Sequence, residues 1–163
     1  MKKYIVTCLV GLCAGLTIAR SPFKCTLYDR ENKIYLHLDL YEESINVPGM
    51  EMFGPMNGYM NGNVYGIWMI TSSKIENEKT ATFRLSNDLG SETQEVKLTV
   101  ENDSTYLLEQ QGGTVIKKVV NKKLVKIPRN LTFNLQRSNL QKTGKALFKV
   151  SSCFSVTNRI TSS

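Results

Sequence analysis

Apolar and polar residues alternate in short runs through most of the chain, and this pattern limits the fold more than any other feature. In one run, Ile34, Leu36 and Leu38 alternate with polar or aromatic residues. A period of two is typical of a strand with one buried face. Turn-forming residues separate such runs at 77–79, 87–90 and 101–104. The sequence therefore predicts an all-β antiparallel meander, either a β-barrel or a β-sandwich of about 8–10 strands.

We expect strands at residues 23–27, 34–41, 45–47, 64–75, 81–86, 96–100, 105–110, 114–120, 123–127 and 131–135, with residues 50–63 as a loop. In the first hairpin, matched apolar faces pair Leu27 with Ile34 and Cys25 with Leu36. This register sets His37, the only histidine, opposite Lys24 on the polar face. We expect a surface histidine that points away from the thiol of Cys25.

The first residues have the pattern of a secretory signal peptide. Lys2 and Lys3 precede an apolar stretch that is short for a membrane span, and small residues lead to a cleavage site after Ala19. An uncleaved anchor is the alternative. We therefore expect an exported protein, periplasmic or secreted and soluble after cleavage, with a signal peptide at 1–19 and an all-β domain at 20–135. Residues 136–163 form a basic, serine-rich tail that we expect to be poorly ordered.

Two cysteines, Cys25 and Cys153, remain after removal of the signal peptide. In an oxidising compartment they form a candidate disulfide between positions near opposite ends of the mature chain. The alternative is that Cys25 is a small core residue and Cys153 lies in the tail.

Charge is divided unevenly along the chain. Residues 20–109 hold 8 basic and 14 acidic residues, whereas residues 110–163 hold 11 basic residues and no acidic one. The densest basic cluster forms a candidate patch for an anionic partner, such as a glycan or a lipid headgroup: Lys117, Lys118, Lys122, Lys123, Lys126 and Arg129. A solvated hairpin that protects a sheet edge is the alternative interpretation. Export makes nucleic acid an unfavoured partner.

Catalytic patterns are weak, so we expect a protein that is not an enzyme and needs no cofactor. The chain has no G-x-S-x-G sequence, and the placement of His37 disfavours a Cys25–His37 nucleophile pair. Glu42 and Glu43 are adjacent on a strand end and point to opposite faces, not into one cleft. A hydrolase remains the least favoured alternative.

A stretch rich in glycine, methionine and aromatic residues precedes the only tryptophan. Four glycines and a proline argue against a helix, and no lysine or following helix supports a phosphate loop. We interpret the stretch as a lid or core element over a small apolar ligand or toward a cell-surface partner. The candidate ligand-binding residues are Met52, Phe53, Met56, Tyr59, Met60, Tyr65 and Trp68. The alternative is Cu(I) binding by the thioethers of Met50, Met52, Met56 and Met60, although no metal site is expected.

The sequence Gly66-Ile67-Trp68 resembles the G-x-W signature of lipocalin-like barrels. That resemblance implies a tryptophan that caps the closed end of the barrel, with Arg129 as the late arginine against its ring. Here, however, strands precede the signature, whereas in those barrels it opens the first strand. The signal peptide, the hairpin at 28–41, Asn87 to Ser91, Glu101 to Tyr106 and Ile127-Pro128 also resemble small exported proteins of Bacteroidales. This second resemblance covers residues 23–135 and implies compartment and fold without implying an activity.

Overall fold

The computed structural model describes residues 21–136. The predicted signal peptide, Cys153 and all but the first residue of the predicted tail lie outside the described residues, so the disulfide stays a prediction. Within the described range, the helical content is one 3-10 turn, η1 (Glu51–Phe53). No helix in residues 21–136 has both the length and the apolar character needed to cross a membrane.

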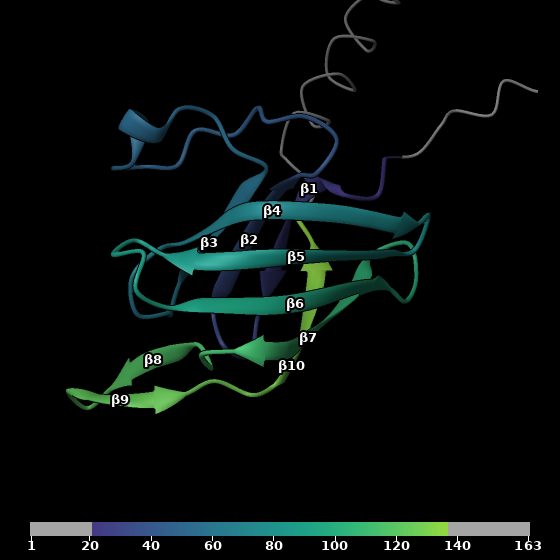
Figure 1. Ribbon diagram of the computed structural model, residues 1–163. Coiled ribbons are helices and arrows are strands. Elements are labelled where there is room, and N and C mark those ends of the chain that lie inside the picture. The colour runs from purple at the N-terminus through teal and green to yellow at the C-terminus, as the bar shows by residue number, and fades with distance from the viewer. Residues whose placement is uncertain (1–20, 137–163) are drawn as a thin grey trace, which may run out of the picture.

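Eight strands close into an antiparallel barrel, and two further strands form a hairpin attached to it (Figure 1). The strands are β1 (Lys24–Asp29), β2 (Ile34–Asp39), β3 (Gly58–Gly62), β4 (Trp68–Asn77), β5 (Thr80–Asn87), β6 (Thr93–Val100), β7 (Thr105–Gly113), β8 (Lys117–Val120), β9 (Lys123–Lys126) and β10 (Asn130–Leu135). The order around the barrel is β1-β10-β7-β6-β5-β4-β3-β2. This closure confirms the predicted all-β antiparallel barrel and decides between the barrel and the sandwich.

The barrel interior is a packed core. Its largest fully buried side chains include Trp68, Tyr106, Phe23 and Phe133. Ile116 and Ile127, which flank the β8–β9 hairpin, belong to the same apolar cluster. Interiors of eight-stranded barrels are just wide enough for side chains to fill, and this barrel is filled in that way.

The first hairpin differs from its predicted register by two residues. Leu27 pairs with Leu36 and Cys25 with Leu38. The buried carboxylate of Asp29 explains the shift, because its Oδ1 accepts the backbone N–H groups of Glu31 and Asn32 at 2.9 and 3.1 Å and so defines a tighter turn. A shift of two preserves the faces of the strand, so His37 still points outward, away from Cys25.

The expectation of a loop over residues 50–63 and a strand from residue 64 is wrong for β3. Gly58 to Gly62 pair with β2 from Leu38 to Ile34, and β4 starts only at Trp68. Asn57-Gly58 and Asn61-Gly62 have a composition typical of hairpin turns, but both glycines belong to β3. A Cβ on Gly58 would lie 2.1 Å from the carbonyl oxygen of His37, so glycine permits the close approach of β3 to β2.

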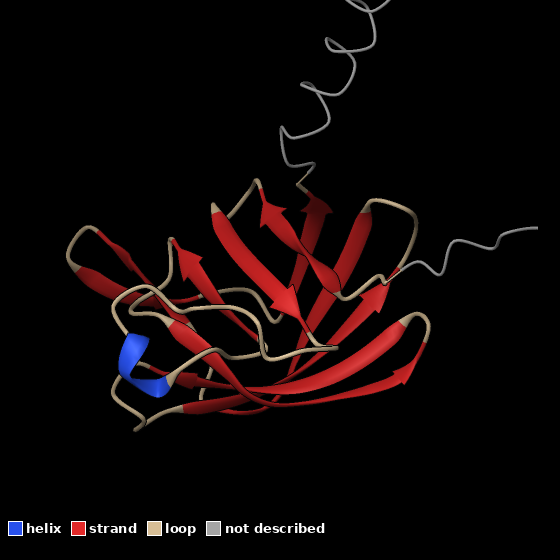
Figure 2. Ribbon diagram, turned by 90° about the horizontal axis from the view of Figure 1, so that it is seen from above, coloured by secondary structure: helices blue, strands red, loops and turns tan. Residues whose placement is uncertain are grey.

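The segment from residue 40 to residue 57 lies against the outer wall of the barrel. Val47 is buried there against Tyr59 and Met69, two neighbouring outward residues of β3 and β4. Ile45 and Met56 form an isolated bridge that closes this segment on itself. Figure 2 shows the segment, with its single helical turn, beside the strands. The structure thus places this loop against the side of the barrel, where it builds a second, smaller apolar cluster.

Candidate functional site

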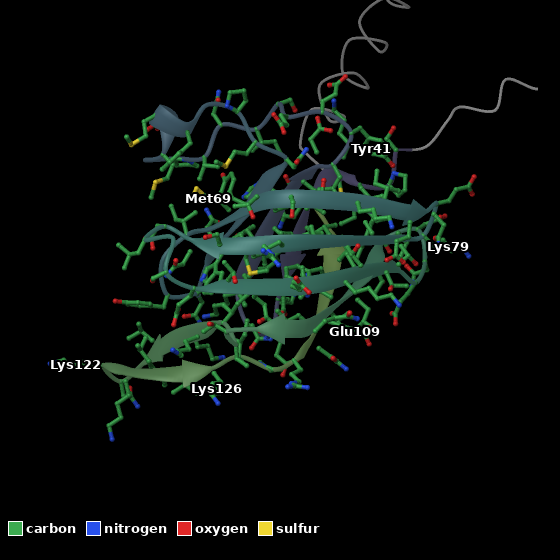
Figure 3. The ribbon with its side chains drawn as sticks, in the orientation of Figure 1. Tyr41, Met69, Lys79, Glu109, Lys122 and Lys126 are labelled. Atoms are coloured by element: carbon green, nitrogen blue, oxygen red, sulfur yellow. The ribbon has the colours of Figure 1, made fainter. Side chains whose placement is uncertain are left out.

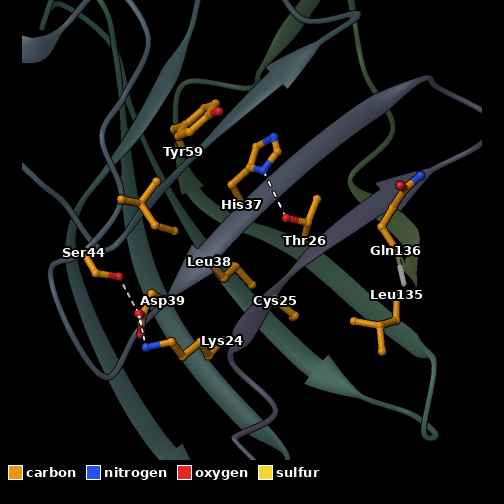
Figure 4. A pocket seen from close by; sticks show the side chains of 11 residues that line it. Lys24, Cys25, Thr26, His37, Leu38, Asp39, Ser44, Tyr59, Leu135 and Gln136 are labelled. Atoms are coloured by element: carbon orange, nitrogen blue, oxygen red, sulfur yellow. Dashed lines mark hydrogen bonds and ion pairs between the residues drawn. The ribbon is translucent and has the colours of Figure 1, made fainter. Parts of the chain in front are cut away.

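An open groove of about 730 Å³ lies on the outer face of β1, β2 and β3 (Figure 4). Loop residues Ser44 and Ile45 border it on one side, and Leu135 and Gln136 at the end of β10 border it on the other. We call it the outer groove. Its lining residues are Lys24, Cys25, Thr26, His37, Leu38, Asp39, Ser44, Ile45, Tyr59, Leu135 and Gln136.

Strand alternation and register bring the polar lining residues together. Lys24 and Thr26 point outward from β1 and pair with Asp39 and His37 of β2. Tyr59 of β3 pairs with His37 from the other side. Three consecutive strands therefore contribute to one polar and aromatic surface.

Asp39 is the electrostatic centre of the outer groove and is only 2% exposed. Its carboxylate accepts an ion pair from Lys24 Nζ at 2.8 Å and hydrogen bonds from Ser44 Oγ and the Glu42 N–H. Burial acts to raise the pKa of Asp39, but these donors outweigh it and hold the pKa below its ordinary value. The same carboxylate ties residues 41–44 to β2.

Lys24 carries the only ammonium group among the lining residues, and it is already shared between carboxylates. Its Nζ lies 2.8 Å from Asp39 and 3.1 Å from Glu42, and hydrogen bonds to both raise its pKa. The positive charge is thus balanced locally, and the lining residues within 21–136 include no unpaired cation for an anionic ligand.

His37 is half-buried between polar and aromatic neighbours. Its Nδ1 lies 3.2 Å from Thr26 Oγ1, and its ring stacks on that of Tyr59 with a centroid separation of 4.5 Å. Burial lowers the pKa of His37, and the Asn61 side chain partly opposes the shift. The imidazole is therefore neutral at pH 7 and can donate or accept a hydrogen bond.

The stack continues away from the outer groove as a row of rings. The ring centroids of Tyr35 and His37 are 6.2 Å apart, and those of Tyr28 and Tyr35 are 4.4 Å apart. Both pairs of rings are stacked. Cross-strand aromatic pairs of this kind stabilise a sheet surface. They also fix the orientation of His37, which makes its exposed edge a rigid binding element.

Among residues 21–136, Thr26 and His37 do not form a catalytic triad with the carboxylate of Asp39. Thr26 and His37 could supply two of the three groups of a catalytic triad, the nucleophile and the base. The third group has to be a carboxylate that orients the imidazole. Within residues 21–136, the carboxylate of Asp39 interacts with Lys24, Ser44 and backbone N–H groups. The side chain that contacts the imidazole of His37 is therefore the uncharged amide of Asn61, whereas a catalytic histidine would need a carboxylate in that place.

The predicted ligand-binding residues are distributed over several surroundings. Tyr59 alone lines the outer groove. Met60 and Trp68 belong to the barrel core, whereas Met56 packs in the outer apolar cluster. The remaining three side chains are exposed, at 87% for Met52, 56% for Phe53 and 52% for Tyr65.

The four methionines of the copper hypothesis are also separated. Met60 points into the barrel, while Met50 and Met56 pack on its outer wall and Met52 is exposed. This placement separates the thioether of Met60 from those of Met50 and Met56, so the four methionines do not share one site. Within residues 21–136, no three His, Cys, Asp or Glu side chains come together as a metal site either.

We expect Met60→Ala to reduce the free energy of unfolding by about 2–5 kcal/mol, because Met60 is fully buried in the core. Met52→Ala is the matched control, and its exposed side chain should change stability by less than about 0.5 kcal/mol. Urea unfolding followed by Trp68 fluorescence measures both. Equal effects would contradict the burial of Met60 in the core and the exposure of Met52.

The basic patch is anchored at its base. Lys117 Nζ lies 3.2 Å from Glu92, and Lys118 Nζ lies 3.2 Å from Asn32. Lys122, Lys123, Lys126 and Arg129 are exposed.

Trp68 is buried and donates its indole N–H to the carbonyl of Tyr65 at 3.2 Å. The thiol of Cys25 donates to the carbonyl of Pro22 at 3.3 Å.

Sequence reasoning missed Lys24, Thr26, Asp39 and Gln136 as site residues. A signal was present for three of them, since Lys24, Thr26 and Asp39 share the outward parity of His37 on adjacent strands. No signal in the sequence identified Gln136, because it follows the last strand and reaches the outer groove only when β10 pairs with β1 to close the barrel. Its backbone N–H donates to the carbonyl of Thr26 at 2.8 Å.

Fold and site together define a closed, filled β-barrel with a polar groove on its outer wall. Comparison with protein-family models, with curated proteins and with solved structures finds no match to this chain in any of the three.

Proposed function

We propose that this chain is an exported binding protein without enzymatic activity, and that it holds a small neutral ligand in the outer groove. The observation that carries the proposal is the pairing of its charges. Lys24 and Asp39 neutralise each other at 2.8 Å, while the uncharged polar groups of Thr26, His37 and Gln136 remain around them. Open concave sites that combine a few polar groups with apolar surface are typical of small-molecule binding.

The lining favours a hydroxyl-rich ligand with an apolar face, such as a short saccharide. Thr26 and His37 can each donate or accept a hydrogen bond, and the Tyr59 ring and Ile45 supply apolar contact. The sequence suggested an apolar ligand beneath the methionine-rich loop. The filled interior leaves no space for one inside the barrel, so we place the ligand outside and assign it a more polar character.

The single histidine makes a direct test possible by NMR. The ring protons of His37 should shift in a saturable way when a matching neutral oligosaccharide is added at pH 7. Thr26→Val keeps the side-chain shape but removes the hydroxyl, so we expect affinity to fall by about two- to ten-fold. Thr132→Val, on the exposed face of β10, is the matched control and should leave affinity unchanged.

Two outcomes would count against this proposal. If no oligosaccharide in a broad panel shifts the His37 resonances at millimolar concentration, the outer groove is not a saccharide site. If a long-chain alkyl compound shifts them instead, the ligand is apolar, as the sequence suggested.

A further inference from the structure

The hairpin formed by β8 and β9 projects from the barrel. We call residues 117–126 the lysine hairpin. Figure 1 shows it extending beyond the other strands, and Figure 3 places Lys122 at its far end and Lys126 nearer the barrel. The turn at Asn121 and Lys122 has positive φ angles of 49° and 64°, the geometry of a two-residue hairpin turn.

The base of the lysine hairpin is fixed to the barrel. Besides the side-chain contacts of Lys117 and Lys118, the N–H of Tyr65 donates to the carbonyl of Lys117 at 2.7 Å. The N–H of Ile127 donates to the carbonyl of Ile116 at 2.9 Å, and both isoleucines are buried in the core. A rigid base presents the far half of the hairpin to solvent in a defined direction.

The far half exposes apolar side chains on both of its faces. Val119 and Leu124 pair directly and share one face, at 50% and 51% exposure. Val120 and Val125 lie on the other face, at 40% and 43% exposure. A protein surface docked against the ribbon from the side would cover only one of these faces. Insertion tip first into a membrane interface covers both.

The charges of the far half point to the same environment. Lys122, Lys123 and Lys126 are exposed, and none of them enters an ion pair within the described residues. No acidic residue occurs after Glu109 in the chain. Apolar side chains that enter the acyl boundary, with lysines at the level of the headgroups, match an anionic lipid surface.

We propose that the lysine hairpin inserts tip first into the interface of an anionic phospholipid membrane. Val119, Val120, Leu124 and Val125 enter the boundary between headgroups and acyl chains. Lys122 and Lys123 lie at the tip, so their long side chains extend back along the hairpin to bring their ammonium groups to the lipid phosphates, which Lys126 contacts from nearer the barrel. The barrel stays outside the membrane. The outer groove lies on other strands, so the membrane contact does not depend on the ligand proposed above.

A tryptophan placed in the hairpin reports insertion locally. The natural Trp68 is 1% exposed and gives a constant background. In the full chain, the emission of Leu124→Trp should shift to the blue on vesicles of phosphatidylcholine mixed with phosphatidylglycerol, and brominated acyl chains should quench it. Vesicles of phosphatidylcholine alone should cause little change. Leu89→Trp, in the turn after β5, is the matched control because Leu89 is 79% exposed but belongs to the barrel and not to the lysine hairpin; it should not shift.

The charge contribution is tested in the same assay. Replacing Lys122 and Lys123 together by glutamine should weaken vesicle binding by about 25-fold, since each lysine near an anionic surface contributes roughly a five-fold factor. High salt should weaken binding of the unmodified hairpin in the same way. Val119→Trp is the second reporter if Leu124→Trp does not fold.

Three results would overturn the proposal. The first is an unshifted hairpin tryptophan on anionic vesicles. The second is an equal shift of Leu89→Trp, which would mean that another part of the chain carries the binding. The third is an equal shift on soluble dextran sulfate without quenching by brominated lipid, which would reassign the lysine hairpin to an anionic glycan or an acidic protein.

Discussion

Gly58→Ala should lower the free energy of unfolding by about 2–5 kcal/mol, because it combines a steric clash with an unfavourable backbone angle. A Cβ at this position would lie 2.1 Å from the carbonyl oxygen of His37 and 3.1 Å from Ile70 Cδ1. The φ angle is 150°, which side chains other than glycine rarely adopt. Relief requires β3 to move away from β2, and that movement separates the rings of His37 and Tyr59.

Gly90→Ala is the matched control for this prediction. Gly90 also has a positive φ, 70°, but a Cβ there would meet no heavy atom within 4 Å. We therefore expect a loss of only about 1–2 kcal/mol from the left-handed backbone. Urea midpoints compare the two variants, and the His37 ring resonances should change only in Gly58→Ala. Equal midpoints would show that close approach to His37 is not the reason for glycine at position 58.

The barrel was predictable because each strand carries its own evidence. Alternation identified β5, β6, β7 and β10 to within a few residues, and the turns between them contain the expected asparagine and aspartate residues. These signals are local, since they depend on which face of a strand meets the core. Closure was not predictable in the same way. It depends on the pairing of β1 with β10, residues more than a hundred positions apart in sequence.

β3 shows where local reasoning failed. Asn57-Gly58 and Asn61-Gly62 have the composition of hairpin turns, and in isolation that interpretation is sound. Tertiary contact overrides it. β2 and β3 approach so closely that a Cβ on Gly62 would lie 2.5 Å from the carbonyl oxygen of Lys33. These glycines therefore permit the close pairing of two strands instead of forming a turn. Composition alone does not separate a glycine that turns the chain from one that another strand approaches.

The candidate site was predictable only in part. The outward placement of His37 follows from strand parity and is correct. The half-burial of His37 beside Thr26 and the Tyr59 ring does not follow from parity, and Tyr59 itself is covered by the segment from residue 40 to residue 57, which folds back over the wall. That return depends on contacts of Val47 with Tyr59 and Met69 on the outside of the barrel. An outer apolar cluster of this kind leaves no periodic mark in the sequence, since its members come from a loop and two strands.

Asp39→Asn should lower the free energy of unfolding at pH 7 by about 2–3 kcal/mol and loosen the wall of the outer groove. The ion pair contributes little by itself, because Lys24 is about half exposed and solvent screens it. Most of the effect comes from Ser44 and the N–H groups of Tyr41 and Glu42, which donate to the carboxylate. Saccharide binding in the outer groove should weaken in the same variant, because residues 41–44 form its wall.

The pH dependence of that loss identifies the carboxylate as its cause. The folded pKa of Asp39 lies below the ordinary value of 3.8. A group of this kind contributes its full stability above pH 3.8, and the contribution disappears as the pH falls through 3.8 and then through the folded pKa. Urea unfolding should therefore show a large gap between wild type and Asp39→Asn at pH 7 that closes in this acidic range. Glu43→Gln changes an exposed carboxylate of the same loop and should give no gap at either pH. A gap that stays constant with pH would mean that the shape of residue 39, and not its charge, holds the loop against the barrel.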